Sequence, residues 1–141
     1  DLHHHAVMAP AHPLADANEL SLAILAEHRL ILPDESYGVR QALERAAHHQ
    51  GVALAPTFKT ASLETQKALA LNGAGVLILP PMAVARECQS GELVSIPLSP
   101  LELEPARIDL CVYRHRQRSF ATEACLSLLA SALQTMTEAS S

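Results

Sequence analysis

Apolar residues form short runs that polar or proline-containing stretches separate. The runs at His5–Met8, Leu30–Leu32 and Val76–Leu79 are each followed by a proline within two residues, which is typical of strands. Val76–Leu79 is wholly apolar and predicts a strand that is buried on both faces, as in a parallel sheet. Further strands are predicted at Val52–Ala55, Leu93–Ile96 and Ile108–Tyr113.

The stretch after Gly38 has apolar residues at helical spacing. Its apolar positions follow an i, i+3, i+4, i+7, i+8 pattern: Val39, Ala42, Leu43, Ala46 and Ala47. The other face, which we expect to be exposed, carries Arg40, Gln41, Glu44 and Arg45. Ser36 is the predicted N-cap, and Gly51 is predicted to end the helix.

Four other stretches predict helices. They are Leu20–His28, a helix capped by Ser62 that runs to Leu71, Met82–Cys88, and Ser119–Met136. The pair Asn72-Gly73 is suited to end the second of these. The last one has an apolar stripe made of Phe120, Ala124, Cys125, Leu128, Leu129, Ala132, Leu133 and Met136. Thr137 to Ser141 is predicted to be a frayed tail.

Strands alternate with helices through most of the chain. This alternation predicts an α/β sandwich with a mainly parallel sheet, in which ligands bind beyond the carboxyl ends of the strands. Two loops meet that condition, Pro33–Gly38 and Thr57–Ser62, and both lead into helix N-termini. The free N–H groups and the helix dipole at such ends favour an anion.

Composition narrows the classes of protein that the chain can represent. The 141 residues are 49% apolar and 18% charged, which fits a domain with a buried core rather than a disordered segment. The net charge of −5 and 3% aromatic content disfavour nucleic-acid binding by this chain. We expect neither a membrane span nor a signal peptide. The basic cluster Arg114–Arg118 is interpreted as a solvated turn.

The histidines and cysteines do not predict a metal site or a catalytic site. Cys88, Cys111 and Cys125 form no C-x-x-C pair and are expected to be buried free thiols. His3-His4-His5 is interpreted as native sequence, and neighbouring His48-His49 point to different sides of their helix. We find no acid–base pair, phosphate-binding glycine loop or nucleophile motif, and we expect no metal, no cofactor and no catalysis.

The order of several motifs resembles one known family. His12-Pro13-Leu14-Ala15 follows a strand, Gly73-Ala74-Gly75 leads into Val76–Pro80, and Ser90-Gly91-Glu92-Leu93-Val94 comes next. Over about residues 5–136 the chain resembles the effector-binding domain of LysR-type transcriptional regulators, which has the type 2 periplasmic-binding-protein fold. The family's N-terminal winged helix-turn-helix and the first half of one lobe have no counterpart here.

The resemblance implies a division of the chain into parts of one domain. Residues 12–105 would form the second lobe of a three-layer sandwich, and residues 1–11 and 106–113 would be crossover strands. Residues 119–136 would be a helix of the first lobe. Because most of that lobe is absent, we expect exposed apolar surface around the crossover strands and the final helix. The DNA-binding domain would belong only to a longer parent protein.

By the same resemblance, a small effector binds between two lobes and shifts the geometry of a DNA-bound oligomer in the cytoplasm. The ligand-binding residues expected in this chain are Ser36, Tyr37, Gly38, Thr60 and Ser62. Their hydroxyl and N–H groups suit a carboxylate or another polar group. A homodimer or homotetramer is expected, with interface candidates Val39, Leu43, Ala46, Val52 and Leu54.

Single side chains near the two loops have competing interpretations. Glu64 is either a surface charge that matches the helix dipole or a group that selects a cationic or hydroxylated ligand. Arg40 is expected to be an exposed helix charge rather than a ligand clamp. Two other function classes stay open at this point: a solute-binding protein for transport, which shares the fold, and a small α/β enzyme.

Overall fold

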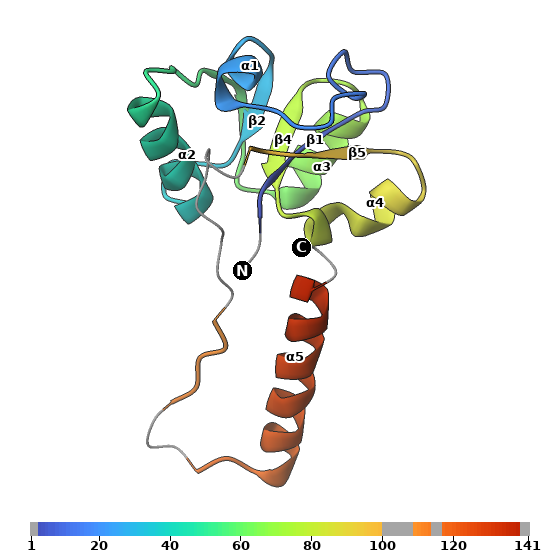
Figure 1. Ribbon diagram of the computed structural model, residues 1–141. Helices are drawn as coiled ribbons and strands as arrows, with labels where there is room; N and C mark the ends of the chain where they lie inside the picture. The colour runs from blue at the N-terminus through green and yellow to red at the C-terminus, as the bar shows by residue number, and fades with distance from the viewer. Residues whose placement is uncertain (1–2, 100–108, 114–116, 139–141) are drawn as a thin grey trace.

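The computed structural model describes residues 3–99, 109–113 and 117–138. Residues 3–99, which we call the lobe, form one sheet covered by helices (Figure 1). The strands are β1 (His5–Met8), β2 (Leu30–Leu32), β3 (Pro56–Lys59), β4 (Val76–Leu79) and β5 (Val94–Pro97). The helices of the lobe are α1 (Leu22–Ala26), α2 (Gly38–His49), α3 (Leu63–Leu71), the 3₁₀ turn η1 (Pro81–Val84) and α4 (Ala85–Gln89). Across the described stretches, no helix has the length and hydropathy of a membrane span.

Four strands of the sheet run in one direction, and β1 runs against them. The order is β3-β2-β4-β1-β5. β2 is parallel to β3 and β4, whereas β1 is antiparallel to both β4 and β5. The carboxyl ends of β2, β3, β4 and β5 therefore lie along one edge, which we call the carboxyl edge, together with the start of β1. The predicted α/β fold with a mainly parallel sheet is confirmed.

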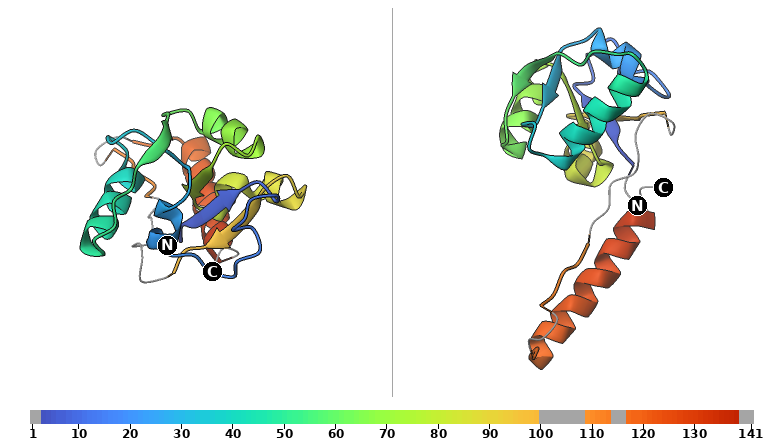
Figure 2. Two further views of the ribbon diagram at one scale, coloured as in Figure 1. Left: turned by 90° about the horizontal axis from the view of Figure 1, so that it is seen from above. Right: turned by 90° about the vertical axis from the view of Figure 1, so that its left-hand side faces the viewer.

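Successive strand residues point to opposite faces of the sheet, and each face has its own core. Ala6 and Met8 of β1 belong to the core shared with α1 and α2, whereas Val7 belongs to the core shared with α3 and η1. β4 divides in the same way, with Ile78 on the first side and Leu77 on the second. Helices cover both faces (Figures 1 and 2), which gives the predicted three layers.

Most of the predicted elements are present with small changes in their bounds. β1, β2 and β4 occupy the predicted residues, and β5 is shifted by one. The helix predicted from Leu20 is shorter than expected, because only Leu22–Ala26 is helical. α3 is capped by Ser62 and ends at Asn72, as predicted, and Gly73 follows with a φ of 71°. Such a left-handed residue is suited to terminate a helix.

The prediction of a strand at Val52–Ala55 is wrong. The strand, β3, begins only at Pro56, inside a stretch that was expected to be a polar loop. β3 is an edge strand in which Pro56 and Phe58 are half-buried and the alternate residues are exposed. Polar side chains suit such a strand, because one of its faces is open to water. Val52 and Leu54 instead pack on the α1/α2 core from the connection that precedes the strand.

The C-terminal part contains a long helix but no further strand among its described residues. Residues 109–113, predicted as a strand, are exposed and irregular, because no neighbouring strand there supplies the hydrogen bonds that a strand requires. α5 (Phe120–Glu138) confirms the predicted helix and includes the first two residues of the predicted tail. The remaining predictions, for Pro100–Ile108, Arg114–Arg116 and residues 139–141, lie outside the described residues.

α5 stands apart from the lobe in Figure 1 and in the right-hand view of Figure 2. Its apolar stripe is consequently open to solvent: Phe120 is 91% exposed, Leu128 73% and Leu129 46%. The expected exposure of apolar surface on the final helix is confirmed.

Candidate functional site

The two loops predicted to bind ligand lie side by side at the carboxyl edge. Residues 33–37 follow β2, and residues 60–62 follow the neighbouring parallel strand β3. Leu32 and Lys59 are in register, and the N–H of Thr60 donates to the carbonyl of Leu32 over 3.3 Å. The sheet therefore brings together two segments that are distant in the sequence.

Ser36 lies in the first loop but is not the N-cap that we predicted. Its N–H donates to Oδ1 of Asp34 over 3.0 Å, and the N–H of Tyr37 donates to the Asp34 carbonyl over 3.1 Å. The bond from the Ser36 N–H is the main reason why the pKa of the Asp34 carboxyl is below its ordinary value. Because this turn uses the backbone of Ser36, Tyr37 takes the N-cap position instead.

The N-terminus of α2 lacks a side-chain cap. Tyr37 is 44% exposed, and its side chain makes no capping hydrogen bond. Beside Gly38 no heavy atom lies within 4 Å of the place where a Cβ would be. The first N–H groups of α2 have no side-chain cap, and the space beside Gly38 is open, which is an arrangement that favours an anion.

The second loop forms a complete cap on α3. Oγ1 of Thr60 accepts from the N–H of Ser62, and Oγ of Ser62 accepts from the N–H of Thr65, each over 3.2 Å. Both hydroxyl groups act as acceptors in these bonds, so each still has its own proton to donate. Glu64 is exposed in the first turn of α3, where its charge matches the helix dipole.

Two further contacts fix the loops, and the sequence analysis identified neither. Gln66 is buried, and its Nε2 donates to the carbonyl of Thr60 over 2.7 Å. Nζ of Lys59 contacts Oε1 of Glu35 over 3.0 Å and so connects the two loops. Because both of these charged side chains are more than half exposed, the ion pair aligns the loops with little net stabilisation.

Arg40 is buried, which contradicts the expectation of an exposed helix charge. Its Nε donates to Oε1 of Glu44 over 2.7 Å, and its Nη1 donates to the carbonyl of Pro33 over 3.4 Å. The side chain is 4% exposed, because it packs between α2 and the end of β2. Its guanidinium is occupied within the lobe, so Arg40 holds the first loop in place rather than presenting a free cation.

The predicted interface residues differ in accessibility. Leu43 is fully buried in the α1/α2 core, so its side chain is not at the surface. The other four are half-buried and pack against the same core: Val39, Ala46, Val52 and Leu54. The surface that they can offer lies along one side of α2 and the connection to β3.

The cysteines are only partly as predicted. All three are free, but only Cys88 is partly buried, and burial raises the pKa of its thiol. Cys111 and Cys125 are exposed, because they lie in residues 109–113 and on α5, outside the lobe. Within residues 3–99, 109–113 and 117–138, no three histidine, cysteine, aspartate or glutamate side chains are grouped so that they could hold a metal ion.

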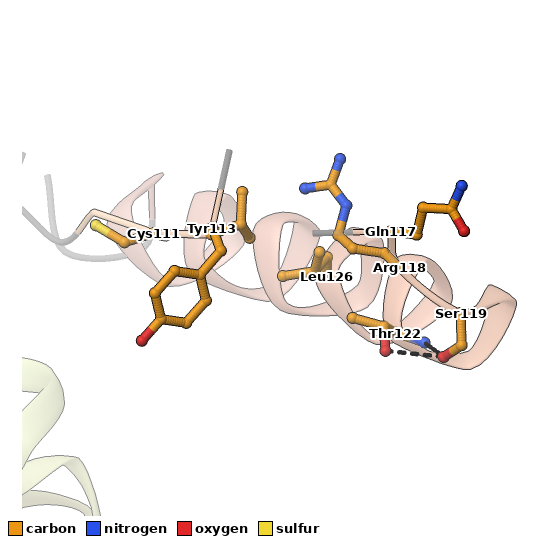
Figure 3. Close-up of a pocket in the computed structure, with 8 residues that line it drawn as sticks. Cys111, Tyr113, Gln117, Arg118, Ser119, Thr122 and Leu126 are labelled. Atoms are coloured by element: carbon orange, nitrogen blue, oxygen red, sulfur yellow. Dashed lines mark hydrogen bonds between the residues drawn. The ribbon is translucent and has the colours of Figure 1, made fainter. Parts of the chain in front are cut away.

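A hollow lies outside the lobe. It has a volume of about 570 Å³ and lies between residues 111–113 and the start of α5 (Figure 3). Arg118, Thr122 and Leu126 contribute to its wall, and the 81% exposed ring of Tyr113 extends from it. The hollow is open and contains none of the predicted ligand-binding residues.

The chain is similar to known proteins in sequence and in fold. A family model described as "LysR substrate binding domain" matches residues 1–134. The chain is 29% identical over 90 residues to the RuBisCO operon transcriptional regulator of Allochromatium vinosum. That match covers 64% of this chain but only 30% of the relative, so the chain spans about a third of the regulator's length.

Solved structures show the same fold at low identity. HinK, a LysR family transcriptional regulator from Pseudomonas aeruginosa, superposes with a TM-score of 0.74 at 18% identity, over 94% of this chain and 45% of that one. The Synechocystis PCC6803 CcmR regulatory domain in complex with 2-PG superposes with a TM-score of 0.70 at 18% identity. This match covers 93% of the present chain and 62% of the CcmR chain.

Proposed function

The chain belongs to the LysR substrate-binding domain family, and we propose that it is the effector-sensing part of a LysR-type transcriptional regulator. A small molecule bound at the carboxyl edge changes the arrangement of a DNA-bound oligomer through its unequal affinity for two conformations. The family match over residues 1–134 carries this proposal and favours it over a transport protein of the same fold. The proposal gives the chain no catalytic step.

The effector site consists of the two loops beside β2 and β3. The first N–H groups of α2, those of Gly38 and Val39, donate hydrogen bonds to an anionic group, and the hydroxyls of Ser36, Thr60 and Ser62 hydrogen-bond to it or to a neighbouring polar group. The ring of Tyr37, which is exposed beside this end of α2, packs on the ligand. A carboxylate-bearing effector fits these groups. The bound 2-PG in CcmR shows that a regulatory domain with this fold takes a small ligand.

The chain is part of one effector-binding domain. Residues 12–105 form its second lobe, residues 1–11 and 106–113 cross between lobes, and α5 packs on the first lobe. The exposed stripe of α5 supports this division, because a helix with Leu128 and Leu129 open to water lacks a packing partner. The DNA-binding domain lies in the remainder of a cytoplasmic parent protein.

The domain pairs with a second copy to give a homodimer, or a homotetramer of the parent. The interface lies along α2 and the connection to β3, where Val39, Ala46, Val52 and Leu54 are half-buried. β3 is an edge strand next to that connection and can extend the interface.

The gene sequence before the codon for Asp1 tests the proposed role. A regulator requires an encoded winged helix-turn-helix segment there, in the same reading frame. An encoded signal peptide in its place would contradict the regulator and support a transport protein. DNA binding by the longer protein, measured with and without a candidate effector, then tests whether ligand and DNA are coupled.

The site itself is tested on the 141-residue chain by NMR titration with sodium acetate, sodium succinate and sodium sulfate. We expect saturable amide shifts at Tyr37–Val39 and near Ser62. Ser62→Ala weakens binding, whereas Ser119→Ala, which removes a similar 3.2 Å cap from α5, leaves binding unchanged. Shifts confined to other surfaces would contradict the assignment of the site and leave family membership untouched.

A further inference from the structure

His4 is buried without the hydrogen bond that a buried imidazole requires. It is 6% exposed, and its Nδ1 is the one buried side-chain nitrogen or oxygen without a partner among the described residues. Buried polar atoms in proteins are nearly always paired, so an unpaired one calls for a physical explanation. Burial lowers the pKa of the His4 imidazole, and the neighbouring His3 and His5 lower it further.

His4 lies where both ends of the lobe leave the sheet. β1 begins at His5, which is paired with Pro97 at the end of β5. The carbonyl of His4 accepts from the N–H of Leu98 over 3.3 Å, so this bond closes the joint between the two departing segments. Figure 1 shows the start of β1 beside β5. A change at His4 therefore acts on the connection between the lobe and the rest of the chain.

Among the described residues, the surroundings of His4 include no group that stabilises a positive charge. Alternation along β1 places its side chain on the same face as Ala6 and Met8, towards α1 and α2. The adjacent strand positions are Pro80, by extension of the β4 register, and Leu98, and neither titrates. The residues that α1 buries are Leu22 and Leu25.

The charged groups that act near this face carry the same sign as an imidazolium or are already paired. His3 and His5 on the same strand repel a charge on His4. The one charged side chain that α2 buries is Arg40, which is held by Glu44 and by the carbonyl of Pro33. On the opposite face, Nδ1 of His5 is paired with Oγ of Ser95 over 2.9 Å. No carboxylate contributes to the pKa shift of His4 within the described chain.

We propose that protonation of His4 controls the joint between β1 and β5. The joint is closed when the imidazole is neutral and opens when the imidazole takes up a proton from solvent. An imidazolium cannot remain buried without a partner, so it moves into water and withdraws its carbonyl from the Leu98 N–H. The joint between β1 and β5 then loosens, so mild acid weakens the connection between the lobe and the rest of the chain. This inference is independent of what the lobe binds.

The sign of the effect follows from linkage. The open state binds a proton more readily than the closed state, because the closed state lowers the pKa of His4. The closed joint therefore keeps its full stability above the ordinary value of 6.5 and loses it as the pH falls below that value. Between pH 7.5 and 5.5 the opening constant rises by up to about tenfold for one such histidine.

The first test is an NMR titration of the unaltered 141-residue chain, which requires no variant to fold. Ring signals of His4 should titrate below pH 6.5, and the protection of the Leu98 amide against hydrogen exchange should begin to fall as the pH decreases from 6.5. Ring titration at or above the ordinary value would overturn the proposal. So would an unchanged protection factor for Leu98 while His4 takes up its proton.

Two variants separate His4 from the other histidines. The pKa values of His5 and His12 are also lowered by burial, so some acid sensitivity remains in any His4 variant. His4→Leu and His4→Gln should each remove up to about tenfold of the fall in the Leu98 protection factor as the pH decreases. His48→Gln, on the exposed side of α2, should retain the full fall in the protection factor. An equal fall in the unaltered chain and in a folded His4 variant would also overturn the proposal.

Discussion

Nε2 of Gln66 lies 2.7 Å from the carbonyl oxygen of Thr60 and donates a hydrogen bond to it inside the lobe. The N–H of Gln66 donates to the carbonyl of Ser62 over 3.0 Å, so one residue of α3 is bonded to two residues of the loop before it. The loop at the candidate site is therefore held by a side chain that is itself buried.

Gln66→Leu should lower the free energy of unfolding by about 1–3 kcal/mol, because the Thr60 carbonyl loses its buried donor. Urea unfolding of the 141-residue chain measures this loss. The matched control is Gln41→Leu: Nε2 of Gln41 also donates to a carbonyl six residues earlier, that of Glu35, but at 3.3 Å and in an exposed place. The control should change stability by less than about 0.5 kcal/mol. Similar losses in both variants would contradict the role given to Gln66.

The burial of Gln66 could not be predicted from the sequence. Helical periodicity marks apolar positions, and a glutamine on α3 is read as part of the polar face. Its burial follows from the path of the loop, which places the Thr60 carbonyl within hydrogen-bond distance of this side chain. Ser62, by contrast, was predicted correctly, because capping depends on residues only three apart.

The acid stability of the lobe should depend on the ion pair between Lys67 of α3 and Glu87 of α4. Their Nζ and Oε1 atoms are 3.0 Å apart, and the side chains are 14% and 15% exposed. The hydrogen bond from Lys67 is the main cause of the lowered pKa of Glu87, so the pair stabilises the fold above the ordinary value of 4.5. That stability is lost as the pH falls through the lower value of the folded state.

Lys67→Met should therefore remove part of the loss of unfolding free energy between pH 6 and pH 3, which denaturant titrations at several pH values measure. Lys59→Met, which breaks the exposed pair with Glu35, should change this pH dependence much less, because its charges stay hydrated. Superimposable pH profiles for Lys67→Met and the unaltered chain would contradict the prediction.

The edge strand β3 and the buried Arg40 could not be predicted from the pattern of apolar and polar residues. β4 was located to the residue, because a central strand is apolar throughout. β3 was misplaced by four residues, because an edge strand with Lys59 at its end has the composition of a loop. Arg40 was expected to be exposed, yet its stem is buried and its guanidinium bonds to Pro33, a contact that exists only once β2 and α2 have docked.

The apolar stripe of α5 should govern association of the 141-residue chain without affecting the stability of the lobe. Leu128 is 73% exposed, so Leu128→Asn should change the free energy of unfolding of the lobe by less than about 0.5 kcal/mol. It should also reduce the binding of a hydrophobic dye and the apparent mass in light scattering. Ser127→Asn, next to it on the helix, is the control and should change neither. A large loss of lobe stability in Leu128→Asn would mean that α5 packs on the lobe in solution.

Substitution by alanine should destabilise the fold at Gly75 but not at Gly38. A Cβ on Gly75 would lie 2.6 Å from the carbonyl oxygen of Arg29, which is backbone and is fixed because it accepts the Val76 N–H over 2.8 Å. Gly75→Ala should therefore lower the free energy of unfolding by about 1–3 kcal/mol, because it forces β4 away from the end of α1 and the start of β2.

A Cβ on Gly38 would meet nothing within 4 Å, so Gly38→Ala should leave the unfolding midpoint in urea unchanged or slightly raised. Any loss of anion binding by Gly38→Ala would then reflect the approach of the ligand to α2 rather than damage to the fold. Equal destabilisation by the two substitutions would show that the open space at the start of α2 is absent in solution.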